Sequence, residues 1–125
     1  MIWITIGVGG AVGSLARHGV NMLVSRVVGQ PLPYATATVN VVGCLVIGVL
    51  AGSIAAGRLH MSMGERAFVF VGVLGGFTTF SSFGLDTLTL AHEGRRLAAL
   101  WNVAGQVGLG LASTFAGYAL GLRGV

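Results

Sequence analysis

Long stretches without a single charged side chain dominate this sequence. Seven arginines and three acidic residues are the only charges in 125 residues, and none lies between Arg26 and Arg58 or between Arg66 and Asp86. Charged residues make up 8% of the chain, against roughly a quarter in ordinary soluble domains. A domain of this size cannot hide so much apolar surface from water. The composition excludes a soluble enzyme and predicts a small all-α integral membrane protein.

Four apolar segments have the length of membrane-spanning helices, which need about 20 residues. Two prolines, Pro31 and Pro33, separate the first segment from the second. Ser62 and Glu65 have the spacing of a capping box at the start of the third segment. The connections are short, so we expect one membrane domain over 1–125 with no extramembrane part. We expect the helices at about 2–28, 34–56, 63–90 and 97–122.

Six of the seven arginines are divided equally between the two sides of such a bundle, and Arg17 lies within a span. The positive-inside rule therefore favours neither orientation. Two interpretations remain: either the chain inserts both ways and pairs as antiparallel protomers, or other signals select one orientation. The arginines are too scattered to form a patch for a phosphate backbone, so nucleic acid is not an expected partner. One side receives Arg58, Arg66 and Arg123, and the other receives Arg26, Arg95 and Arg96.

Polar residues recur at helical spacing within three of the segments, which indicates faces turned away from lipid. Arg17 lies well inside the first segment, where it either snorkels to an interface or takes a buried structural or vestibule role. The stripes are Gly10, Ser14, Arg17, Asn21 and Ser25; Thr36, Asn40, Gly43 and Cys44; and Asn102, Gln106 and Ser113. Gly9/Gly13, Gly48/Gly52 and Gly117/Gly121 form small-xxx-small patterns typical of close helix packing.

The third segment contains the most specific pattern of the chain, GGFTTFSSFG over 75–84. Two glycines followed by two β-branched threonines disfavour a continuous helix, so we expect a break at 75–79. Non-helical backbone at membrane depth is tolerated only when it is buried in protein or lines a cavity. Such a break frees carbonyl groups that can coordinate a cation and creates a helix N-terminus that can face an anion.

Two phenylalanines, Phe80 and Phe83, follow the expected break at a spacing of three residues. The edge of an aromatic ring is partly positive. A small anion that loses its water can exchange it for ring edges, an amide N–H and hydroxyl groups, without a fixed positive charge to trap it. We expect Asn40, Phe80, Phe83 and the neighbouring serines to offer such weak donors.

At these residues the sequence resembles the Fluc (CrcB-type) fluoride ion channels. The resemblance covers the whole chain and rests on the stretch from Gly9 to Arg17, on VNVVG over 39–43, and above all on GGFTTFSSF over 75–83. It implies a four-helix subunit, an antiparallel dual-topology homodimer and two fluoride pores. The pore residues that it implies are Asn40, Phe80 and Phe83, with Ser81, Ser82 and Ser113 as further matches.

The resemblance also implies one cofactor, a structural sodium ion at the dimer centre. Backbone carbonyls of Gly75 and Thr78 from both subunits would hold it. The implied function is passive export of fluoride, which lowers its concentration in the cytoplasm, across the inner or plasma membrane as a multi-pass protein. Fluoride, the lipid bilayer and a second copy of the chain are then the partners.

Two other functions need to be weighed against a fluoride channel. A small multidrug-type proton-coupled exporter has a similar size and topology, but it needs a membrane carboxylate in its first helix, and 2–28 contains no Asp or Glu. A non-transporting assembly subunit of a larger complex would need a partner chain and would move no ion. An enzyme is not expected, because His18, His60 and His92 are dispersed and no nucleophile–base pair or metal-binding cluster is present in the sequence.

Overall fold

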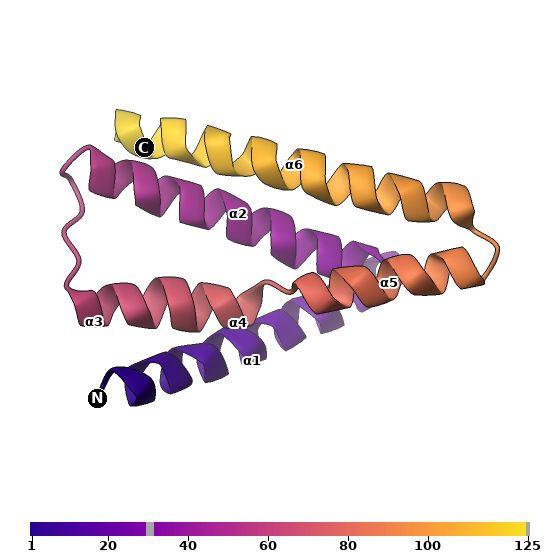
Figure 1. Ribbon diagram of the computed structural model, residues 1–125, viewed down its shortest axis with the longest axis horizontal. Coiled ribbons are helices and arrows are strands. Elements are labelled where there is room, and N and C mark those ends of the chain that lie inside the picture. Colours follow the sequence, from indigo (N-terminus) through magenta and orange to yellow (C-terminus); the bar gives the residue numbers. More distant parts are fainter. Residues whose placement is uncertain (30–31, 125) are drawn as a thin grey trace.

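A computed structural model describes residues 1–29 and 32–124, and these residues form helices joined by short connections, with no strand among them. Figure 1 shows the helices running roughly along the long axis of the molecule, with both termini toward the same end. In chain order the helices are α1 (Ile2–Val28), α2 (Tyr34–Ala55), α3 (Met63–Arg66), the π-helix η1 (Ala67–Leu74), α4 (Gly75–Phe77), α5 (Phe80–His92) and α6 (Arg96–Arg123).

Within the described residues, three helical runs are long and apolar enough to cross a membrane: α2, the run Met63–His92 and α6. Their most apolar 18-residue windows have mean hydropathies of 2.1, 1.6 and 1.2. α1 has 27 residues but does not reach this level, because Arg17 and His18 interrupt its apolar sequence. The fold is therefore that of an all-α protein with membrane-spanning helices.

The run Met63–His92 begins at the capping box that the sequence predicts. The Ser62 N–H donates to Glu65 Oε2 at 2.8 Å, and the Glu65 N–H donates to Ser62 Oγ at 3.1 Å. The π-helix that follows, Ala67–Leu74, has no counterpart among the sequence predictions. Its wider turn lies directly before the segment that carries the break.

Glycines bring two pairs of helices into close contact. α2 packs along α6 (Figure 1) because Gly48 and Gly52 face the carbonyl groups of Thr114 and Tyr118, where an added methyl group would collide. α1 packs against η1 and α4 in the same way through Gly9 and Gly13. These contacts are the small-xxx-small packing that the glycine patterns predict.

The break in the third helical run is shorter than the sequence predicts and lies later. Gly75 and Gly76 are helical, and only Thr78 and Thr79 are extended, with φ/ψ of −86°/158° and −152°/118°. Gly76 stays helical against the backbone of α1, and its added Cβ would lie 2.6 Å from the Gly10 carbonyl oxygen. Gly76 thus serves helix packing, and the backbone leaves the helix at the two threonines.

Candidate functional site

The side chain of Asn40, on α2, is bound to the broken backbone of the third helical run. The Thr79 N–H donates to Asn40 Oδ1 at 2.8 Å, and Asn40 Nδ2 donates to the Thr79 carbonyl at 3.1 Å. The backbone groups of Thr79 thereby find partners outside a helix, which a dry interior requires. Asn40 is therefore the residue that satisfies the backbone N–H and carbonyl groups of Thr79.

Thr79 also caps the helix that starts after the break. Its Oγ1 accepts a hydrogen bond from the Ser82 N–H at 3.1 Å and lies 3.2 Å from the hydroxyl of Ser81. Its hydroxyl donates to the Ser82 Oγ at 3.1 Å. A cluster of three hydroxyl groups therefore surrounds the N-terminus of the 13-residue helix α5, the end of a helix that attracts negative charge.

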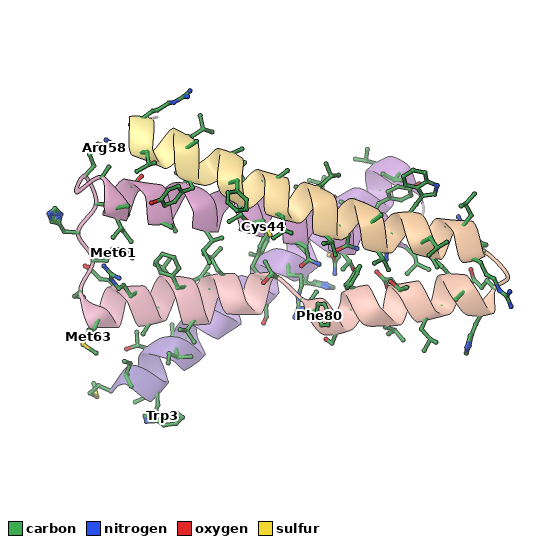
Figure 2. All side chains as sticks on the ribbon, turned by 45° about the horizontal axis from the view of Figure 1, so that its top comes forward. Trp3, Cys44, Arg58, Met61, Met63 and Phe80 are labelled. Atoms are coloured by element: carbon green, nitrogen blue, oxygen red, sulfur yellow. The ribbon has the colours of Figure 1, made fainter. Side chains whose placement is uncertain are left out.

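The two phenylalanines form a pair at the first turn of α5. Their ring centroids are 5.5 Å apart and the planes are tilted by 47°. Figure 2 shows Phe80 directly after the break, near the middle of the molecule. Phe80 is 83% exposed in the single chain. One side of this ring pair is therefore free to contact another molecule.

A cavity of about 370 Å³, the break cavity, lies beside these residues. It is mostly apolar, and its polar lining comes from α2, from the break and from α6. The lining brings together the predicted pore residues Asn40, Phe80 and Phe83 and the predicted cation ligands Gly75 and Thr78. Members of the polar stripes also line it: Gly43, Cys44 and Gln106.

A chain of polar side chains connects the break to the next turn of α5. Asn40 Nδ2 donates to Gln106 Oε1 at 2.9 Å, and Gln106 Nε2 donates to Asn102 Oδ1 at 2.8 Å. Asn102 Nδ2 donates to Thr87 Oγ1 at 2.9 Å, and the Thr87 hydroxyl donates to the Phe83 carbonyl at 2.8 Å. We call the side chains of Asn40, Gln106, Asn102 and Thr87 the amide chain. It links α2, α6 and α5 around the turn that carries both phenylalanines.

A second cavity of about 370 Å³ lies on the other side of the break. We call it the arginine cavity, because Arg17 lines it with His18 and Asn21 from α1, together with Ser81 and Ser82 from α5. Arg17 is half-buried and lines this polar cavity. Of the two roles considered for Arg17, this position favours the vestibule role.

The predicted site residues therefore fall into three places. Asn40, Gly75, Thr78, Phe80 and Phe83 line the break cavity, and Arg17, Ser81 and Ser82 line the arginine cavity. Ser113 lies on α6 outside the linings of both cavities, and Gln106 of the same polar stripe takes the place nearest the break. The sequence did not single out Gln106 as a pore residue, but it indicated the residue through the polar stripe of Asn102, Gln106 and Ser113.

The carbonyl groups of Gly75 and Thr78 have lost the partners that a continuous helix would give them. The Thr79 N–H, which would bond to the Gly75 carbonyl, donates to Asn40, and the Ser82 N–H, which would bond to the Thr78 carbonyl, donates to Thr79 Oγ1. Backbone carbonyls are ligands that hard cations accept. The residues present thus fit a cation at this position.

The molecule combines membrane-spanning helices with a helix broken beside a cavity and with polar groups inside the bundle. These features are typical of a membrane protein that binds a small ion. The sequence profile of the family described as CrcB-like protein, Camphor Resistance (CrcB), matches residues 4–118. The chain belongs to this family and is a multi-pass membrane protein.

Related proteins match over nearly the whole chain. One from Rhizobium etli is 43% identical over 92% of this chain and 91% of its own length, and one from Paracoccus denitrificans is 44% identical over 95% and 93%. Both bear the name fluoride-specific ion channel FluC. A protein from Nitrobacter hamburgensis, named fluoride-specific ion channel FluC 2, is 44% identical over 96% of each chain.

Proposed function

We propose that this protein is a fluoride-selective ion channel and not an enzyme. The observation that carries the proposal is the pair of Phe80 and Phe83 at the break, beside side-chain amide and hydroxyl groups in a mostly apolar cavity. The names of the related proteins support the choice of fluoride among small anions. Asn40, Phe80 and Phe83 line the pathway, with the hydroxyl groups of Ser81 and Ser82 beside it. Ser113 remains a prediction for a part of the pathway outside both cavities.

The chemistry of the lining suits a compact anion that has lost its water. The ring edges carry partial positive charge, and the amide and hydroxyl groups donate hydrogen bonds. None of these groups carries a full charge, so the ion is held firmly enough to enter and weakly enough to leave. Arg17 in the second cavity attracts anions toward the break without binding directly to the ring pair.

The functional unit is an antiparallel homodimer in the lipid bilayer, with all four long helical segments crossing the membrane. Phe80 is a pore residue on this proposal and is 83% exposed in one chain, so a second chain is needed to enclose its pathway. α1 crosses the bilayer although it is less apolar, because Arg17, His18 and Asn21 face the arginine cavity. The equal arginine counts on the two sides permit both orientations.

A structural sodium ion at the dimer axis completes the proposed assembly. The carbonyls of Gly75 and Thr78 from both subunits would hold it, since the helical partners of both carbonyls are engaged elsewhere. The ion would offset the free-energy cost of leaving these carbonyl groups without hydrogen bonds in a dry interior. Fluoride then leaves the cytoplasm passively, down its own gradient, through the inner or plasma membrane.

Fluoride efflux from liposomes that contain only this protein tests the proposal. Liposomes loaded with potassium fluoride, with valinomycin to balance charge, should release fluoride to an ion-selective electrode. Liposomes loaded with potassium chloride should release little chloride, and protein-free liposomes give the baseline. Efflux at the baseline, or equal efflux of both anions, would show that the protein is not a fluoride-selective channel.

A further inference from the structure

The arginine cavity adjoins the break cavity at Thr79, which lines both of them. Its wall includes Ser81 and Ser82, whose hydroxyl groups surround the N-terminus of α5 together with the Thr79 hydroxyl. An anion in the arginine cavity therefore lies beside the break and beside a helix end that attracts negative charge. The charge of this cavity sets how many anions are present next to the break.

Two neighbours on α1, Arg17 and His18, supply the charged and titratable side chains of the arginine cavity. Thr36 and Val39 from α2 are uncharged, and so are the remaining described residues of the lining, so none of them is acidic. Asp86 on α5 lies close to Thr36 and is the carboxylate that approaches the lining from outside. Because Arg17 keeps its charge at every ordinary pH, the charge of the lining changes only with the protonation of His18.

The surroundings of His18 allow it to gain and lose a proton. Its side chain is exposed in the single chain, and histidine side chains in general change their charge between about pH 5 and 8. Arg17 beside it opposes protonation by repulsion of like charge. Asn21, three residues later on the same helix face, favours it, because its side-chain oxygen is buried and has no hydrogen-bond partner among the described residues. A protonated imidazole has two N–H donors and a neutral one has a single N–H donor.

We propose that His18 is a pH-dependent positive charge at the entrance to the break, so that fluoride efflux rises when His18 is protonated. The inference rests on the proposed function and adds a regulation to it. Arg17 and His18 line the arginine cavity and not the break cavity, so they raise the anion concentration beside the ring pair without holding the ion there. Protonation therefore acts on the entry of the anion, and its effect is largest when fluoride is scarce.

Fluoride efflux from liposomes, measured with the same pH on both sides, tests the proposal. At a low fluoride concentration, efflux through the wild-type protein should rise at least about threefold from about pH 8 to about pH 6. At a saturating fluoride concentration the rise should disappear. Hydrogen fluoride is neutral, crosses lipid without a protein and is more abundant at low pH, so protein-free liposomes supply the baseline at each pH.

Variants of the three histidines assign the pH dependence to one side chain. His18→Gln removes the titratable charge and should conduct at the high-pH rate throughout, whereas His18→Arg carries a permanent charge and should conduct at the low-pH rate throughout. His60→Gln is the matched control, because His60 lies between α2 and α3 and lines neither of the two cavities. A variant with both His60→Gln and His92→Gln leaves His18 as the last histidine of the chain and should keep the full rise, so it decides the question even if the His18 variants fail to fold.

The outcomes separate this inference from the proposed function. Wild-type protein that releases fluoride at the same rate at every pH would overturn the role of His18 and leave the channel in place. An unchanged rise in His18→Gln, or the loss of the rise in the variant that lacks His60 and His92, would do the same. A rise that persists at saturating fluoride would contradict an effect on entry. Wild-type protein that releases no fluoride at any pH would overturn the proposed function and this inference together.

Discussion

Asn40 and Thr79 lie 39 positions apart in the sequence and are joined by two hydrogen bonds, 2.8 Å and 3.1 Å long. The Asn40 side chain thus gives the Thr79 backbone both the hydrogen-bond donor and the hydrogen-bond acceptor that a helix would have provided. The same amide donates to Gln106 at 2.9 Å. The geometry of the break and the geometry of the proposed anion site therefore depend on one side chain.

Replacement of Asn40 by Asp should abolish fluoride efflux and lower stability. The carboxylate still accepts from the Thr79 N–H, but it cannot donate to the Thr79 carbonyl or to Gln106 Oε1, and it places negative charge beside an anion pathway. We expect a loss of about 1–3 kcal/mol in the free energy of unfolding, the usual cost of unsatisfied buried polar groups. Thermal unfolding in detergent and liposome efflux measure the two effects. If this variant releases fluoride as fast as the wild type, the pathway does not pass Asn40.

Phe80→Ile and Phe83→Ile should each reduce fluoride efflux at least about tenfold, since an aliphatic side chain offers no partly positive ring edge and tenfold corresponds to about 1.4 kcal/mol. Stability should change little at Phe80, which is 83% exposed in the single chain. Phe115→Ile, on α6 at 74% exposure, is the matched control and should conduct normally. Equal efflux in all three variants would exclude a role for the ring pair.

Gly48→Val should destabilise the protein by about 1–3 kcal/mol, the usual cost of overpacking. Its added carbon atoms meet the carbonyl group of Thr114 on α6, which cannot move aside as a side chain can. Gly7→Val is the control, because no other atom lies within 4 Å of a Cβ at Gly7. The difference in stability between the two variants, measured by thermal unfolding, reports how tightly α2 and α6 pack. Equal stabilities would mean that the two helices can move apart at little cost in free energy.

Sodium should be required for assembly and should not be conducted. Protein purified and reconstituted in N-methylglucamine salts without sodium should lose fluoride efflux or dissociate into monomers, because the carbonyls of Gly75 and Thr78 then lack a partner. Potassium should restore little, since it is larger than a tight carbonyl site accepts. Full efflux from sodium-free protein would contradict the proposed ion, as would a measurable sodium current.

A reporter fused to the C-terminus should give comparable signals on both sides of the membrane. Arg58, Arg66 and Arg123 on one side balance three arginines on the other, so insertion has no preferred direction. Adding two lysines beside Arg95 should shift most molecules to one orientation and reduce efflux, because antiparallel pairs then become rare. Uniform orientation of the unmodified chain would refute the antiparallel dimer.

Local sequence determined the helical segments and several of their contacts. Pro33, the capping box at Ser62 and Glu65 and the polar run before Arg96 are local signals, and a helix begins beside each of them. Pro31 lies outside the described residues. The glycine patterns also correctly indicated where α2 and α6 approach closely. Such signals need only neighbours within one or two turns, so no knowledge of the tertiary structure is required to interpret them.

Tertiary structure decided where the break falls and which residues reach it. Gly76 has low helix propensity, yet it remains helical with the backbone of α1 packed against it. The break lies at Thr78 and Thr79 instead, where Asn40 supplies the bonds that the Thr79 backbone lacks. A polar stripe on a helix defines its face but not its depth. The packing of α6 against α2 brings Gln106 to the break and leaves Ser113 about two turns further along, because the register between two helices is set by their contacts and not by either sequence alone.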